Sequence, residues 1–115
     1  MAKADETPIY VAAYKLLTQI TQLVGNFPRN RRVLAAQMFE EAHRLVQCVF
    51  RANYSRDKVP LIRRAQEYLG SIRLSLRLST DFGLITPRQF GTTVETATEV
   101  GKQASGWIKY MEGRA

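Results

Sequence analysis

A chain of 115 residues in which 45% are apolar can bury a hydrophobic core of its own, so it needs neither disulfides nor a metal ion to fold. Seventeen Lys and Arg against ten Asp and Glu give a net charge of +7, which favours a polyphosphate or an acidic protein as partner. No apolar run approaches the roughly 20 residues of a membrane span, and residues 1–8 lack the apolar core of a signal peptide. We therefore expect a cytoplasmic protein with no membrane partner.

The first two predicted helices cover residues 8–25 and 31–53. Thr7 offers a hydroxyl N-cap, and Pro8 suits the first position of a helix. The sequence GNFP at residues 25–28 ends this first helix. The second helix carries one apolar stripe at helical spacing, made of Leu34, Met38, Ala42, Leu45, Val49 and Ala52.

The third predicted helix, residues 58–80, contains a segment whose pattern conflicts with a helix. Residues 72–79 alternate between apolar and polar side chains, which is the period of a β-strand. No second strand-like segment is present to pair with this one, and a lone strand is not stable. We therefore interpret the segment as helical, with Asp57 as the expected N-cap of the helix.

The fourth predicted helix, residues 87–112, begins with a capping box in which Thr86 is the N-cap and Gln89 follows three residues later. The connections between the four helices are short, which makes sequence neighbours antiparallel. The sequence therefore predicts an all-α fold. We expect a single domain over residues 1–115, built as an antiparallel up-down-up-down four-helix bundle.

Two of the helices carry more apolar residues than one core-facing stripe requires. At 100° per residue, Leu74 and Leu78 lie nearly opposite the core stripe of their helix, while Phe39 and Phe50 widen the apolar arc of residues 31–53. A helix of a monomeric bundle needs one apolar face, so we expect these four residues to make subunit contacts. The alternative is that they pack under a neighbouring helix of the same chain.

No catalytic or metal-binding set can be assembled from this sequence. Glu40 and His43 have the Glu-x-x-His spacing of di-iron bundles, but such a site needs two copies and His43 is the only histidine. Glu95 and Glu99 lie one turn apart, as on a solvated helix face. The single cysteine, Cys48, lies in an apolar run, where cysteines are usually buried and inert. We expect no enzyme activity, no metal and no cofactor.

All of the net charge lies in the middle of the chain. Residues 29–80 hold eleven Lys and Arg, ten of them Arg, against four Asp and Glu, whereas residues 1–28 and 81–115 are each neutral. Arginine favours bidentate contact with phosphate or carboxylate groups. Seven arginines are therefore candidate contacts for a nucleic acid or a protein partner: the turn cluster of Arg29, Arg31 and Arg32, the helical stripe of Arg63, Arg73 and Arg77, and Arg64, which faces elsewhere. The alternative is an ordinary solvated face.

Six short motifs occur in an order and spacing that resemble a known family. They are Phe27-Pro28-Arg29, Met38-Phe39, Leu69 to Leu78 with Arg73 and Arg77, Ile85-Thr86-Pro87-x-Gln89, Glu99-Val100-Gly101-Lys102 and Gly106-Trp107-Ile108. Together they resemble the accessory variability determinants of diversity-generating retroelements, over nearly the whole chain.

This resemblance implies a homopentameric barrel of four-helix bundles without catalytic activity. It also implies a basic surface that binds the retroelement's reverse transcriptase and template RNA, with cDNA as a further candidate, and that supports error-prone cDNA synthesis. Arg73 and Arg77 match the family's basic positions best, and Arg29 lies in the matching Pro-Arg turn.

The four-helix proteins encoded in ribosomal RNA intervening sequences are wider relatives of this family. They typically carry an Asn-Ile-Ala-Glu-Gly-like stretch late in the second helix, where residues 49–53 of this chain read VFRAN. This difference favours the retroelement family. The alternative function is a structural four-helix oligomer of the intervening-sequence type, which binds an acidic protein.

Overall fold

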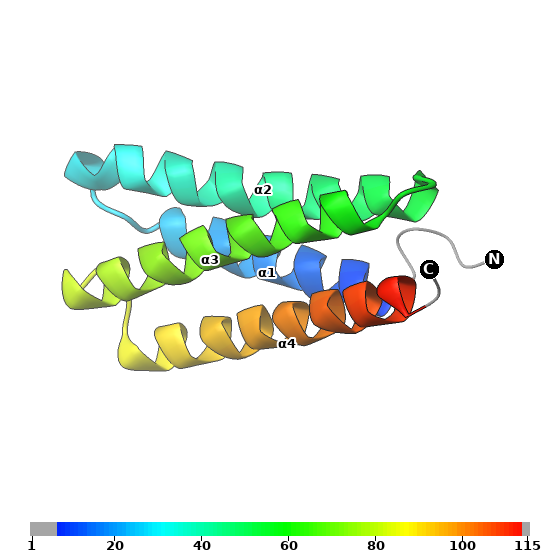
Figure 1. Ribbon diagram of the computed structural model, residues 1–115. Coiled ribbons are helices and arrows are strands. Elements are labelled where there is room, and N and C mark those ends of the chain that lie inside the picture. The colour runs from blue at the N-terminus through cyan, green and yellow to red at the C-terminus, as the bar shows by residue number, and fades with distance from the viewer. Residues whose placement is uncertain (1–6, 114–115) are drawn as a thin grey trace.

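The structure, a computed structural model, describes residues 7–113, which form four α-helices and one short 3₁₀ helix (Figure 1). The elements are α1 (Pro8–Val24), η2 (Arg29–Arg31), α2 (Arg32–Tyr54), α3 (Val59–Asp81) and α4 (Pro87–Glu112). Each α-helix begins and ends within one residue of its predicted range, and no strand occurs within residues 7–113.

The α-helices run alternately in opposite directions, so that the start of α1 and the end of α4 lie at the same end of an elongated bundle (Figure 1). α2 and α4 each pack against both α1 and α3, whereas no diagonal pair of helices approaches closely within the part of the chain that the structure describes. The bundle measures 47 × 21 × 19 Å. The antiparallel four-helix bundle predicted from the sequence is therefore confirmed.

Apolar side chains from all four helices fill the axis of the bundle. The fully buried ones include Leu16 and Ile20 from α1, Met38 and Leu45 from α2, Ile72 and Leu76 from α3, and Val100 from α4. The alternating segment at residues 72–79 is helical, and Leu74 points away from the core that Ile72 and Leu76 enter. None of the described helices is both long enough and apolar enough to cross a membrane.

The prediction that Asp57 caps α3 is wrong. The N-cap is Lys58, and its side chain makes no capping hydrogen bond to α3. Lys58 Nζ instead donates to the carbonyl oxygens of Ala52, Asn53 and Ser55 at 2.8, 3.2 and 3.0 Å. The last carbonyls of a helix lack intrahelical partners and carry partial negative charge. The ammonium group of Lys58 therefore stabilises the connection between α2 and α3 by hydrogen bonds to carbonyl oxygens at the end of α2.

Thr86 begins α4 with the predicted capping box. Gln89 N donates to Thr86 Oγ1 at 3.0 Å, and Thr86 N donates to Gln89 Oε1 at 2.8 Å. We expect Thr86→Ala to lower the free energy of unfolding by about 1 kcal/mol, because it removes the acceptor of the Gln89 amide. Thr92→Ala, at an exposed position inside α4, is the matched control and should change this free energy by less than about 0.5 kcal/mol. Equal effects in urea denaturation would contradict the capping role.

Candidate nucleic-acid interface

A groove of about 600 Å³ between α3 and α4 is lined by cationic and small side chains. Arg73 of α3 and Lys102 and Lys109 of α4 supply its charge, and no Asp or Glu is among the described residues that line it. Gly70 and Gly101 are among its small residues. An anion in this groove would meet an arginine from one helix and two lysines from the other. We call the groove that Arg73, Lys102 and Lys109 line, together with Gly70 and Gly101, the α3–α4 basic groove.

Arg73 lies half-buried against α4. Its Nη2 donates to Thr98 Oγ1 at 3.4 Å. A Cβ placed on Gly101 would lie 3.8 Å from the same nitrogen and 3.5 Å from Leu69 Cδ2. A methyl group at position 101 would make ordinary van der Waals contacts with both side chains, and Thr98 contacts the Arg73 guanidinium at the wall of the groove.

Lys102 and Lys109 are not among the contacts predicted from the sequence, because residues 81–115 are neutral as a segment. The acidic and basic side chains of α4 lie on different faces of that helix. Glu95 and Glu99 line a different groove, of about 780 Å³, between α1 and α4, whereas the two lysines line the α3–α4 basic groove. The seven-residue spacing of the lysines, which places both on one helix face, is the signal that could have found them.

The other two arginines of the predicted stripe each have a carboxylate partner. Arg63 Nη2 lies 2.7 Å from Glu112 Oε2 of α4, and Arg77 Nε lies 3.3 Å from Asp81 Oδ1, one turn further along α3. All four side chains are more than half exposed, so these ion pairs contribute little to stability. Glu112 is 49 residues away from Arg63 in the sequence, and only the packing of α4 on α3 brings the two together.

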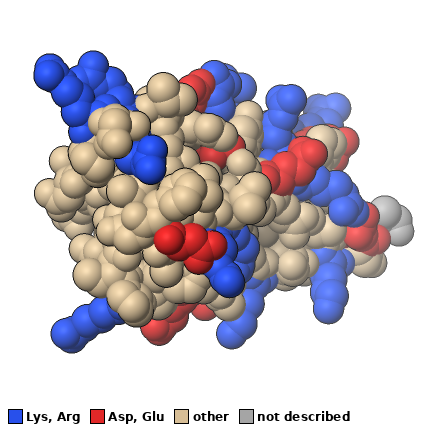
Figure 2. Space-filling view, turned by 90° about the vertical axis from the view of Figure 1, so that its left-hand side faces the viewer, with Lys and Arg blue, Asp and Glu red and all other residues tan. Residues whose placement is uncertain are grey.

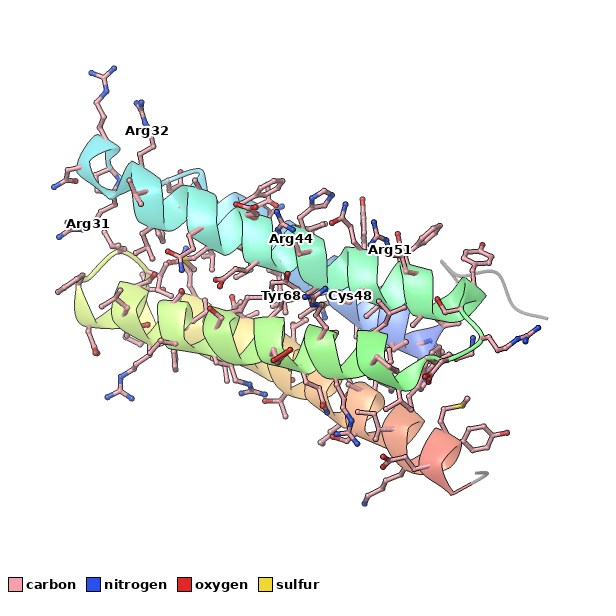
Figure 3. The ribbon with its side chains drawn as sticks, turned by 45° about the horizontal axis from the view of Figure 1, so that its top comes forward. Arg31, Arg32, Arg44, Cys48, Arg51 and Tyr68 are labelled. Carbon is pink, nitrogen blue, oxygen red and sulfur yellow. The ribbon has the colours of Figure 1, made fainter. Side chains whose placement is uncertain are left out.

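The predicted turn cluster is not one convergent site. The Arg31 guanidinium lies 5.0 Å from the centroid of the Phe82 ring, whereas Arg32 extends from the opposite side of the same helix end (Figure 3). Arg29 is exposed in η2. On this end of the bundle, cationic side chains project in several directions rather than gathering into one patch (Figure 2). The cation–π contact of Arg31 instead joins the start of α2 to the end of α3.

Arg64 belongs to a second group of cations, on the face between α2 and α3. Burial raises the pKa of the Cys48 thiol, and the positive charges of Arg64, Arg51 and Arg44 act on it in the opposite direction. Arg44 and Arg51 extend from α2, with Cys48 and Tyr68 between α2 and α3 (Figure 3). We call Arg44, Arg51 and Arg64 the arginine triad.

Arg44 and Arg51 were not predicted as contacts, although their seven-residue spacing on one helix marks a shared face. Arg44 donates through Nη2 and Nε to Glu40 Oε1, at 2.7 and 3.0 Å. This hydrogen bond raises the pKa of Arg44 above its usual value, so the guanidinium is cationic at every physiological pH.

A comparison with protein-family models adds an independent observation. Residues 9–111 match a model described as bAvd-like. The chain belongs to the bAvd-like family. This match spans most of every α-helix and confirms the resemblance to accessory variability determinants. No curated protein matches the sequence.

In this bAvd-like chain, the four residues predicted to make subunit contacts all lie at the surface rather than under a neighbouring helix. They occupy two faces. Leu78 lines a groove of about 300 Å³ with Val33 and Phe82, and Leu74 lies one turn before it on α3. Phe39 and Phe50 lie on α2, where both make ring contacts.

The Glu-x-x-His pair of this bAvd-like chain is engaged in other interactions. Glu40 bonds to Arg44, and the His43 ring stacks on Phe39 with 5.8 Å between centroids. Among residues 7–113, no group of three or more metal-ligating side chains is found.

Proposed function

We propose that this bAvd-like protein is a non-catalytic accessory protein of a diversity-generating retroelement. In this proposal it binds the reverse transcriptase and the template RNA, with cDNA as a further ligand, and supports mutagenic cDNA synthesis. The family match supports the retroelement setting. The buried, unpaired Cys48 fits a reducing compartment, so we place the protein in the cytoplasm.

The α3–α4 basic groove is the observation that carries this proposal. It brings Arg73, Lys102 and Lys109 together from two helices without an acidic side chain among its described lining residues. A groove of this charge suits a phosphate backbone, because each neutralised phosphate releases condensed counterions. Arg77, one turn after Arg73 on α3, extends the cationic surface beyond the groove.

We also propose that the subunits assemble as a homopentamer. Leu74, Leu78, Phe82 and Val33 form an exposed apolar patch at one end of the bundle, and such patches suit protein contacts. Around a ring of subunits, the α3–α4 basic grooves would repeat at regular intervals. A nucleic acid longer than one subunit could then engage several grooves at once.

Charge reversal at Arg73 and Arg77 tests the proposed function. We expect Arg73→Glu with Arg77→Glu to abolish retention of template RNA and of the reverse transcriptase in a pull-down, because it replaces two cations by two anions. Helical content and sedimentation should stay unchanged, since both side chains lie outside the core. The matched control is Arg56→Glu with Arg88→Glu, which changes the net charge equally at two exposed positions outside the groove.

Unchanged retention by the Arg73→Glu, Arg77→Glu variant would overturn this site, as would an equal loss in the control. For the unaltered chain, neutralising three phosphates of a single strand gives a slope of about −2 in log affinity against log salt. If the unaltered chain retains an acidic protein but no RNA, the alternative function of a structural oligomer is favoured instead.

A further inference from the structure

A row of aromatic side chains lies along the face formed by α1 and α2. Ring contacts lead from Tyr14 to Tyr10, with 6.0 Å between centroids, then to Phe50 at 6.2 Å and on to Tyr54 at 5.3 Å. Tyr14, Phe50 and Tyr54 are 51%, 45% and 69% exposed. These rings therefore pack on one another at the surface while keeping much of their area open to a ligand.

Phe39 and His43 continue this surface along α2. His43 stacks on Phe39 and also lines a groove of about 290 Å³ that it shares with Tyr10 and Phe50. We call Tyr10, Tyr14, Phe39, His43, Phe50 and Tyr54 the aromatic row. At 1.5 Å per residue, its members on α2 span about 22 Å, from position 39 to position 54.

One member of the arginine triad, Arg51, lies beside the aromatic row. Arg51 lines the same groove as Tyr10 and Phe50, and the described residues of that lining include no Asp or Glu. Arg44 lies two turns before Arg51 on α2 and pairs with Glu40, whereas Arg64 lies on α3. Arg51 is therefore the cation that borders the rings directly.

We propose that this face binds single-stranded RNA, with bases stacked on the aromatic row and a phosphate paired with Arg51 at its edge. The inference rests on the proposed function for its ligand class, a nucleic acid, and adds a second site and a strand form. Rings can stack on any base, while cations follow the backbone. A single strand is the form whose bases are free to stack on protein side chains. At 3.4 Å per stacked nucleotide, about six nucleotides match the row.

RNA suits this face through its sugar as well. Gln47 is exposed in the groove between Tyr10 and Arg51, and its amide can donate to or accept from a 2′-hydroxyl. The hydroxyl groups of the row's tyrosines add further hydrogen-bonding groups at its edge.

A second copy of the chain fits this face less well than RNA does. Every copy of the chain carries a net charge of +7, so the cationic edge of this face, at Arg51, attracts a polyanion more than it attracts a second copy. Tyrosine hydroxyls also favour an interface with water at its edge. The proposal therefore assigns Phe39 and Phe50 to RNA, and leaves Leu74 and Leu78 for the subunit contact.

Fluorescence anisotropy with the full chain and a labelled ten-nucleotide oligo(U) tests the proposal. We expect Phe50→Ala with Tyr54→Ala to weaken oligo(U) binding by roughly fivefold to 150-fold for each base that loses its stacking partner. Binding to an RNA duplex of the same length should stay unchanged. Phe50→Trp and Tyr54→Phe keep a ring and should retain affinity. Tyr110→Ala, which removes an exposed ring on α4 outside the row, the α3–α4 basic groove and the proposed subunit patch, is the matched control and should bind as the unaltered chain does.

Unchanged oligo(U) affinity in the Phe50→Ala, Tyr54→Ala variant would overturn the proposal. A parallel loss of duplex binding would overturn the single-strand assignment, and equal or tighter binding of oligo(dU), which lacks only the 2′-hydroxyl, would overturn the assignment to RNA. A fall in the sedimentation coefficient of the variant would show that the aromatic row makes a subunit contact, and would overturn the proposal as well.

Failure of the proposed function gives a different result. In that case the unaltered chain binds neither template RNA nor oligo(U). If the aromatic row alone is wrongly assigned, the unaltered chain still binds both, and Arg73→Glu with Arg77→Glu still removes template binding.

Discussion

We expect Leu76→Ala to lower the free energy of unfolding by about 2–5 kcal/mol, and Leu74→Ala to change that of the dissociated subunit, at low protein concentration, by less than about 0.5 kcal/mol. The two leucines lie two residues apart in α3, yet Leu76 is fully buried and Leu74 is 71% exposed. Truncation of Leu76 removes buried apolar area and leaves a cavity between packed helices. Truncation of Leu74 removes a side chain that is largely in water.

Urea denaturation followed by circular dichroism measures both variants, at two protein concentrations. Equal losses for Leu74→Ala and Leu76→Ala would contradict the helical geometry of residues 72–79, because a strand would place both leucines on one face. A loss for Leu74→Ala that grows with protein concentration would instead identify Leu74 as a subunit contact, since association stabilises the folded state by mass action.

Ser71→Ala is expected to lower the free energy of unfolding by about 1–3 kcal/mol. Ser71 Oγ of α3 donates a hydrogen bond to Glu41 Oε2 of α2. The other carboxylate oxygen, Glu41 Oε1, is buried and has no hydrogen-bond partner among the described residues. Removal of the serine hydroxyl therefore takes away the hydrogen bond that the structure gives this half-buried carboxylate.

A double-mutant cycle gives this prediction its control. Glu41→Met, combined with Ser71→Ala, replaces both polar partners by apolar groups and should recover most of the stability that Ser71→Ala loses. Ser105→Ala, at an exposed position of α4, should change the stability by less than about 0.5 kcal/mol. If the double variant is no more stable than Ser71→Ala alone, the Glu41 carboxylate is not the source of the effect.

The number, order and ends of the helices could be predicted because their determinants are local. Thr7 and Thr86 each accept a hydrogen bond from an amide of the first helical turn, as their positions before Pro8 and Pro87 predict. The alternating segment at residues 72–79 could be assigned only by asking what it would pair with. No partner strand exists within residues 7–113, so the helical period prevails.

The start of α3 could not be predicted from cap preferences alone. Asp57 has the preferred chemistry of an N-cap, but the ammonium group of Lys58 reaches back to three carbonyl oxygens at the end of α2. That contact depends on the path of the chain between two antiparallel helices. The preferences of single residues for cap positions do not predict the path of the chain between the two helices.

Charge along the sequence predicted two of the six cations in the α3–α4 basic groove and the arginine triad. Arg73 lines the α3–α4 basic groove and Arg64 lies in the arginine triad, but Arg31 is taken up by Phe82. Lys102 and Lys109 were not predicted, because residues 81–115 have no net charge as a segment. A sum over consecutive residues discards the helical face on which each charge lies, and that face decides which charges meet.

The sequence by itself determined the secondary structure, the antiparallel order of the helices and the excess of arginine, because hydrophobic period, capping residues and composition act over a few neighbouring positions. Only the tertiary structure decided which cations share a surface. Arg73 lines a groove with the lysines of α4, Arg63 pairs with Glu112, and the aromatic row joins α1 to α2, in each case between two helices rather than within one. These groupings depend on the rotation of each helix about its axis, which is fixed when the four apolar stripes pack into one core.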